Sequence, residues 1–188
     1  STLMRSSAAS DVYKRQAGET AECAKIFGID PKVAMLSYST LGSGKGPSVT
    51  KVANATKKIK EAAPELAVEG EIQFDASVSP EVAEVKCPGS PVAGQANTFI
   101  FPDINAANIG YKIASRLGGY TAVGPVLQGL NAPINDLSRG CNAEEVYSMS
   151  IVTAALSVPE EEKVDEEGLE AIVRAVVETM LAAKKLDK

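Results

Sequence analysis

The chain has 188 residues, with 19 basic and 24 acidic side chains, three Cys, and neither His nor Trp. Its length and its 45% content of hydrophobic residues predict one folded domain with an apolar core. Without an imidazole, the chain can supply no Ser-His-Asp triad, no Cys-His pair and no histidine metal ligand. Acid–base chemistry would depend on carboxylates, Lys, Tyr or Cys.

The cysteines and the hydropathy pattern indicate the environment of the protein. Cys23, Cys87 and Cys141 are far apart and form no CxxC pair. This spacing favours a reducing compartment and argues against a zinc site or a disulfide framework. No stretch approaches the ~18 continuous apolar residues of a membrane span. We therefore expect a soluble cytoplasmic protein with no bound metal.

Helices and strands are predicted to alternate along residues 17–156. Residues 1–16 are polar and Ser-rich and are expected to be a non-native or disordered leader. Helices are predicted over 17–29, 48–63, 80–86, 106–117 and 142–156, and strands over 32–38, 66–74, 97–101 and 122–127. The alternation predicts an α/β fold, a mostly parallel sheet with helices on both faces.

Two further segments follow this domain. Residues 157–168 are predicted to be an acidic linker, because Pro159 to Gly168 carries six acids and one Lys. Residues 169–188 are predicted to form an amphipathic helix, since their apolar side chains recur at helical spacing. This helix either packs on its own protein or docks on another, as short helices that recruit enzymes into bacterial microcompartments do.

A glycine-rich loop is predicted at the end of the first strand. Parallel sheets bind ligands at the ends of their strands. The loop, Ser39–Gly46, departs from the nucleotide-binding P-loop at both ends, yet its glycines and Lys45 still indicate an anion site. Between Asp30 and Glu61 the chain has six Lys and no acid, which favours the same interpretation. The alternative is a flexible turn. The candidate ligands are Ser39, Thr40, Ser43 and Lys45.

Two later loops carry the other candidate residues. After the strand at 97–101, Asp103, Asn105 and Asn108 gather at a helix start, where capping explains one of them. Asn105 and Asn108 are then candidate substrate ligands.

The last loop, 128–139, is followed by a helix. Arg139 offers a guanidinium suited to phosphate, beside the Ser138 hydroxyl. Glu145 follows Asn142 at capping-box spacing, so it is either a helix cap or a catalytic carboxylate. The candidate substrate ligands of this loop are Gln128, Asn135 and Asp136.

Five motifs closely resemble the phosphate acetyltransferase family in order and spacing, and the resemblance covers roughly residues 17–156. They are 32–41 (KVAMLSYSTL), 71–75 (EIQFD), 97–112 (NTFIFPDINAANIGYK), 124–129 (GPVLQG) and 133–141 (PINDLSRGC). The resemblance implies reversible acetyl transfer between coenzyme A and inorganic phosphate. It also implies a two-domain fold like that of the isocitrate and isopropylmalate dehydrogenases, with the site in the interdomain cleft.

The resemblance further implies roles for single residues. Ser138 and Arg139 match the family's Ser-Arg pair, which stabilises the transferring acyl-phosphate. Glu145 falls where relatives carry an Asp that deprotonates the coenzyme A thiol. Coenzyme A is then a substrate, and no cofactor is expected. Relatives carry a substantial upstream segment, so the fold is expected to be incomplete at the N-terminus and the 188-residue chain to have little activity alone.

Two alternatives to acetyl transfer remain open. One is a phosphate butyryltransferase, since the walls that set acyl length cannot be placed from the sequence. The other is a non-catalytic module that senses acyl-CoA or organic phosphate, like that of malic enzymes. The expected partners are acetyl-CoA, phosphate and a second copy in a homodimer, with no nucleic acid and no membrane. The expected location is the cytoplasm or a bacterial microcompartment.

Overall fold

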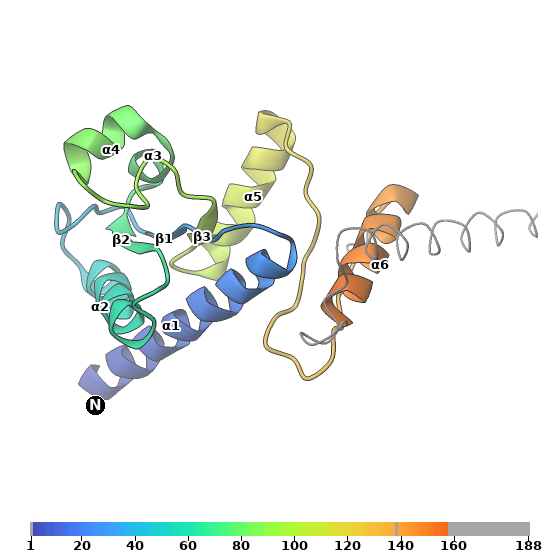
Figure 1. The fold of residues 1–188 in the computed structure, drawn as a ribbon, viewed down its shortest axis with the longest axis horizontal. Coiled ribbons are helices and arrows are strands. Elements are labelled where there is room, and N and C mark those ends of the chain that lie inside the picture. Colours follow the sequence, from blue (N-terminus) through green and yellow to red (C-terminus); the bar gives the residue numbers. More distant parts are fainter. Residues whose placement is uncertain (1, 138, 158–188) are drawn as a thin grey trace, which may run out of the picture. The chain divides into compact units, whose positions relative to one another are not determined.

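The computed structural model describes residues 2–137 and 139–157 (Figure 1). The chain divides into two compact units, residues 1–121 and residues 122–188. The first unit contains, in order, α1 (Thr2–Ile26), β1 (Val33–Leu36), α2 (Pro47–Ala62), β2 (Val68–Ile72), α3 (Phe74–Val78), α4 (Pro80–Lys86), β3 (Thr98–Ile100) and α5 (Ile104–Gly118). The described part of the second unit includes α6 (Ala143–Ser157).

The three strands of the first unit form a parallel sheet in the order β2-β1-β3. Val33 of the central strand lies opposite Val68 on one side and Thr98 on the other. All four residues of β1 are buried, as expected for a central strand covered on both faces. The structure thus confirms the predicted α/β class and the parallel sheet.

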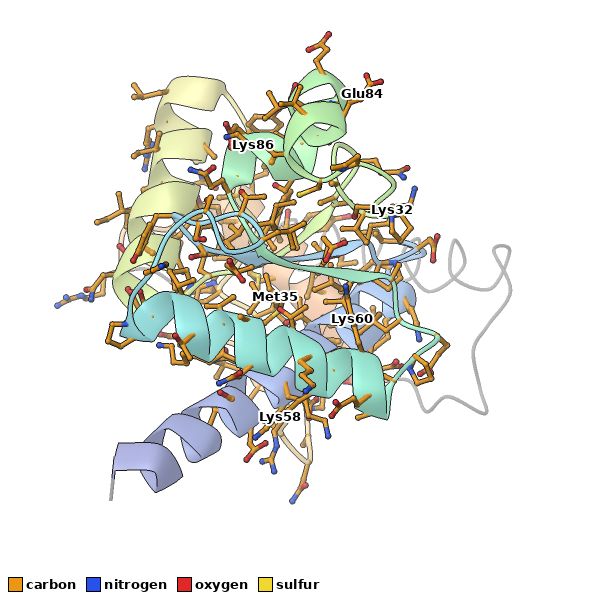
Figure 2. All side chains as sticks on the ribbon, turned by 90° about the vertical axis from the view of Figure 1, so that its left-hand side faces the viewer. Lys32, Met35, Lys58, Lys60, Glu84 and Lys86 are labelled. Carbon is orange, nitrogen blue, oxygen red and sulfur yellow. The ribbon has the colours of Figure 1, made fainter. Side chains whose placement is uncertain are left out.

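Helices cover both faces of this sheet. Successive residues of a strand point to opposite faces, so Val33 and Met35 join one apolar cluster, and Ala34 and Leu36 join another. The cluster around Met35, labelled in Figure 2, takes its other members mainly from α1 and α2. The second cluster includes Ala76 of α3 and Cys87, which follows α4.

The N-terminal helix is longer than the sequence predicts. Residues 1–16 were expected to be a non-native or disordered leader, and disorder is wrong for residues 2–16, which form the first part of α1. From Ser10 onward, the buried residues of α1 recur at helical spacing and are Ser10, Tyr13, Ala17, Ala21 and Ala24. Most of them are small, so a search for large apolar side chains misses the stripe.

Contacts with α2 hold this first part of α1. The Ser10 hydroxyl donates to the Lys51 carbonyl at 3.3 Å, and the Lys51 ammonium lies 4.6 Å from the centre of the Tyr13 ring. Farther along α2, Lys58 forms an ion pair with Asp11 at 2.6 Å. Residues 10–16 therefore pack as part of the first unit.

The strand predicted over 122–127 is absent, and these described residues have no regular structure. A strand needs a hydrogen-bonded neighbour, and Pro125 has no N–H to offer. The Leu127 N–H instead donates to the side chain of Asn135 at 2.9 Å. The other predicted strands are present, each somewhat shorter than expected.

The predicted helices over 48–63, 80–86, 106–117 and 142–156 are confirmed within two residues at each end. Among the helices within 2–137 and 139–157, none combines the length and apolar character that crossing a membrane requires. The predicted linker beyond Ser157 and the predicted helix at 169–188 lie outside the described residues.

Candidate functional site

The loop that follows β1 is built around a buried carboxylate, that of Glu71. Met35 lies opposite Gly70, and Leu36 lies opposite Ile72, so the register of β2 skips Glu71. Such a bulge turns a side chain away from the regular ladder. The Glu71 side chain enters the loop, and the residue is only 4% exposed.

Three donors of the loop bond to Glu71. One carboxylate oxygen, Oε1, accepts from the Ser39 hydroxyl at 2.9 Å and from the Gly42 N–H at 2.6 Å. The backbone carbonyl of Glu71 accepts from the Leu41 N–H at 3.0 Å. The anion held by this loop is therefore a side chain of the protein itself.

The remaining N–H groups from Ser39 to Gly44 are also satisfied inside the loop. The Thr40 N–H donates to the Ser43 hydroxyl oxygen at 2.9 Å, and the Ser43 N–H returns to the Thr40 carbonyl at 3.0 Å. The Gly44 N–H donates to the Ser39 hydroxyl oxygen at 2.9 Å. The three glycines of Ser39–Gly46 were predicted to let N–H groups approach an anion, but in this conformation the N–H groups of Gly42 and Gly44 donate to side chains of the protein. Ser39 and Thr40, predicted as substrate ligands, are buried.

A second network joins this loop to the end of β2. The Thr40 hydroxyl oxygen accepts from the Gln73 N–H at 2.9 Å. The Lys86 ammonium of α4, labelled in Figure 2, donates to Gln73 Oε1 at 2.9 Å and to Asp75 Oδ2 at 2.8 Å. The hydrogen bond from Lys86, helped by the Ala76 N–H, lowers the pKa of Asp75.

Sequence reasoning missed that residues 71–75 hold the loop after β1 through hydrogen bonds. Apart from the predicted strand at 66–74, these residues appeared only as a family motif, although one signal was available. A carboxylate and an amide stand at Glu71 and Gln73, near the end of that predicted strand. Buried polar groups need partners, and a loop rich in N–H and hydroxyl donors precedes them.

The outer side of the loop presents Ser43 and Lys45, which are both exposed. The Lys45 ammonium has no hydrogen-bond or ion-pair partner among the described residues. The hydroxyl of Tyr38 donates to the Lys45 carbonyl at 2.8 Å and fixes the backbone there. A Cβ at Gly44 would lie 2.8 Å from the Tyr38 ring, so glycine is needed for this packing. This side of the loop offers a cation and a hydroxyl to an anionic ligand.

The loop after β3 opens at the same edge of the sheet. Asp103 caps α5, since its carboxylate accepts from the N–H groups of Asn105 and Ala106 at 2.9 and 3.0 Å. Asn105 and Asn108 lie three residues apart in the first two turns of α5, and both are exposed. Neither side-chain amide bonds to another described residue, so both amides can reach a ligand.

The third predicted loop belongs to the second unit. Asn135 joins two segments of that unit, because its carbonyl oxygen accepts from the Leu127 N–H and its NH₂ donates to the Thr153 hydroxyl of α6 at 2.8 Å. Asp136 accepts from the Leu137 N–H at 2.8 Å. Gln128 is exposed on the same loop.

The predicted catalytic residues cluster at the start of α6 in the sequence. Arg139 is exposed, and its guanidinium has no partner among the described residues. Glu145 forms the predicted capping box with Asn142. Ser138 lies outside the described residues.

Two other titratable groups of the first unit have shifted pKa values. Burial raises the pKa of Glu69, but hydrogen bonds from Lys60, from Ser90 and from the Gly70 N–H outweigh it, so that the pKa is lowered. Burial, with the nearby charge of Glu69, raises the pKa of the Cys87 thiol. Within residues 2–137 and 139–157, no three His, Cys, Asp or Glu side chains group in a way that could hold a metal ion.

Comparisons with known proteins agree with this architecture. The family described as "Phosphate acetyl/butaryl transferase" matches residues 13–154. A phosphate acetyltransferase of Bacillus subtilis is 61% identical over 137 residues, which cover 73% of this chain and 42% of that protein. The chain thus spans less than half the length of the curated relatives it matches.

Solved structures of phosphotransacetylases are also similar to this chain over part of their length. A phosphotransacetylase from Streptococcus pyogenes matches with a TM-score of 0.75 and 59% identity, over 78% of this chain and 44% of the other. A phosphotransacetylase from Staphylococcus aureus matches with a TM-score of 0.75 and 56% identity, over 79% of this chain and 46% of the other.

Proposed function

Because the chain belongs to the phosphate acetyl/butaryl transferase family, we propose that it is part of an enzyme that moves an acetyl group reversibly between coenzyme A and inorganic phosphate. The observation that carries the proposal is the 61% identity with a phosphate acetyltransferase over 137 residues. The match with a phosphotransacetylase structure supports it. Coenzyme A, acetyl phosphate and phosphate are then substrates and products.

Glu145 is proposed as the general base. In the direction of acetyl-CoA formation, its carboxylate takes the thiol proton of coenzyme A, and the resulting thiolate attacks the carbonyl carbon of acetyl phosphate. A C–S bond forms, and the bond between the carbonyl carbon and the oxygen that bridges to phosphorus breaks. Phosphate leaves with the electrons of that bond. A carboxylate held near the thiol can do this work in a chain without His.

Arg139 and Ser138 are proposed to stabilise the charge that develops on the carbonyl oxygen and on the departing phosphate. A guanidinium offers planar, paired donors that match phosphate oxygens. Donors directed at a developing oxyanion are often the largest single contribution to such a reaction. The exposed position of Arg139 supports this role.

The exposed polar residues are proposed to bind the substrates. Phosphate oxygens and the amides of a pantetheine chain can accept hydrogen bonds from exposed hydroxyl, ammonium and amide groups. Such groups belong to Ser43, Lys45, Asn105 and Asn108 in the first unit and to Gln128 in the second. Ser39, Thr40, Asn135 and Asp136 already bond within their own units, so a direct contact with substrate would need a rearrangement.

The finer expectations from the sequence belong to the same proposal. They are a two-domain fold like that of the isocitrate and isopropylmalate dehydrogenases, a homodimer, a location in the cytoplasm or a microcompartment, and a helix at 169–188 that packs on its own protein or docks on another. The parallel sheet with helices on both faces is compatible with that fold.

A substrate comparison tests the proposal. The full-length protein that contains this chain is assayed for phosphate-dependent release of coenzyme A from acetyl-CoA and from butyryl-CoA. Acetyl phosphate formation with a higher kcat/KM for acetyl-CoA supports the proposal. A preference for butyryl-CoA indicates the butyryltransferase alternative. Binding of acyl-CoA without turnover indicates a sensing module and contradicts it.

A further inference from the structure

We propose that Glu71 is a positioning residue, which holds the loop from Ser39 to Gly44 in the shape that presents Lys45 and Ser43 to the anionic substrate. This inference rests on the proposed function. Glu71 touches no substrate in this account and takes no part in proton transfer. It acts through the loop that follows β1.

The carboxylate replaces a ligand inside the loop. Glycine-rich loops in P-loop proteins direct their N–H groups at a bound phosphate. Here the Gly42 N–H and the Ser39 hydroxyl both donate to Glu71 Oε1, at 2.6 and 2.9 Å. The loop therefore keeps one shape without a bound anion, and its N–H groups are not available to substrate.

The position of Lys45 depends on this arrangement. Ser39, which bonds to Glu71, also accepts from the Gly44 N–H at 2.9 Å. Gly44 directly precedes Lys45, whose carbonyl is fixed by Tyr38 at 2.8 Å. The loop is thus held on both sides of the exposed ammonium. Loss of the Glu71 carboxylate would remove the acceptor of the Gly42 N–H and the short acceptor of the buried Ser39 hydroxyl, and so loosen one of these two ties.

Glu69 provides a matched control on the same strand. It is buried like Glu71, and its carboxylate also accepts hydrogen bonds. Its carboxylate accepts from the Lys60 ammonium at 2.9 Å, from the Gly70 N–H at 3.1 Å and from Ser90, and none of these donors belongs to the loop from Ser39 to Gly44. Removing Glu69 should disturb β2 without changing the loop.

The experiment compares Glu71→Ala, Glu71→Gln and Glu69→Ala in the full-length protein. Steady-state kinetics with acetyl-CoA and phosphate give KM and kcat separately. Since hydrogen bonds to a charged group are worth about 1.5–3 kcal/mol, Glu71→Ala should raise the KM of an anionic substrate by about tenfold or more, with little change in kcat. Glu71→Gln, whose amide oxygen can accept both bonds, should restore most of the affinity.

Further measurements separate positioning from a general loss of stability. Amide hydrogen exchange of the peptide that covers residues 38–47 should speed up in Glu71→Ala and stay unchanged in Glu69→Ala. A Lys45→Met variant should raise the same KM, and Glu71→Ala should add little when combined with it. An unchanged KM in a folded Glu71→Ala protein, or an equal rise in Glu69→Ala, would overturn the inference while leaving the proposed function intact.

A binding measurement covers the case in which the wild-type protein shows no turnover. That result would contradict the proposed function but not the role of Glu71. Calorimetric titration with coenzyme A then decides, since binding that depends on Lys45 and weakens in Glu71→Ala supports the role. Binding that is absent, or equal in wild type and Glu71→Ala, refutes it.

Discussion

Asn142 and Glu145 bond to each other in both directions at the start of α6. The Asn142 side-chain oxygen accepts from the Glu145 N–H at 2.9 Å, and Glu145 Oε2 accepts from the Asn142 N–H at 2.9 Å. This is the reciprocal capping box that the sequence offered as one interpretation of Glu145. The second carboxylate oxygen accepts no hydrogen bond from a described residue. The cap and the proposed role as a base are therefore compatible.

Glu145→Gln separates these two roles. Glutamine also completes a capping box, so the free energy of unfolding should change by less than about 1 kcal/mol. Glutamine cannot take a proton, so kcat of the full-length enzyme should fall by about 10²-fold or more. Kinetics and urea unfolding measure the two effects. The neighbouring Glu144→Gln is the control. An unchanged kcat in Glu145→Gln would contradict the role of Glu145 as a base and indicate that it acts only as a helix cap.

Gly70→Ala should be among the most destabilising single changes in β2. Gly70 has φ +154°, and a Cβ there would lie 2.6 Å from the Met35 Cβ. We expect a loss of about 2–4 kcal/mol in the free energy of unfolding, measured in urea. At Gly89 the φ is also positive but the space is open, so Gly89→Ala should cost only about 1 kcal/mol. Equal effects at both positions would contradict the close packing at Gly70.

Stability should fall in acid partly through Glu69. Its pKa is lowered in the folded state by the bonds from Lys60, Ser90 and the Gly70 N–H, which outweigh burial. The folded state then binds this proton less tightly than the unfolded state, whose Glu pKa is about 4.3. The contribution is present above that pH and is lost as the pH falls through the folded pKa.

Urea unfolding between pH 6 and pH 3 measures this effect. These pH values span about one unit or more on each side of the unfolded-state pKa of Glu69. The unfolding free energy of Glu69→Gln should depend less on pH than that of the wild type. Glu84→Gln, which changes an exposed carboxylate, should keep the wild-type slope. A slope in Glu69→Gln equal to that of the wild type would contradict the prediction.

Cys87 should react slowly with thiol reagents. The residue is buried and its thiol pKa is raised, whereas Cys23 and Cys141 are partly exposed. Only the thiolate reacts, so labelling of Cys87 near neutral pH should be slower than that of the other two by about tenfold or more. Mass mapping of labelled peptides identifies each site, and unfolding in urea should make all three react. Equally fast labelling of native Cys87 would contradict its burial.

Local apolar patterns were sufficient to predict most elements of the first unit. The continuous apolar run at Val33–Leu36 fixes a central strand, and Val52 and Ile59 mark the buried side of α2. The stripe of α1 was missed because its members are mostly small, and Ser10 is polar. The prediction of a strand at 122–127 was wrong, because a strand depends on a neighbouring strand that the local sequence does not reveal.

The candidate site was predicted less completely than the fold. Lys45 lies in the loop after β1, Asn105 lies in the first turn of α5 and Arg139 precedes α6, as the predicted elements imply, whereas their roles as ligands stay predictions. The bulge that turns Glu71 into the loop depends on the pairing of Met35 with Gly70, which is a contact between strands. The sequence showed the glycines of the loop, but not that the Glu71 carboxylate accepts from the Gly42 N–H.

Arg139 is proposed to stabilise the transferring group in an acetyl-CoA:phosphate acetyltransferase of which this chain is a part. The most direct measurement is the rate of acetyl phosphate formation from acetyl-CoA and phosphate by the full-length protein, with wild type, Arg139→Lys and Arg139→Ala compared. We predict turnover by the wild type, a loss of about 10²-fold or more in kcat/KM for Arg139→Ala, and a partial loss for Arg139→Lys. Absence of wild-type turnover, or full activity of a folded Arg139→Ala protein, would contradict it.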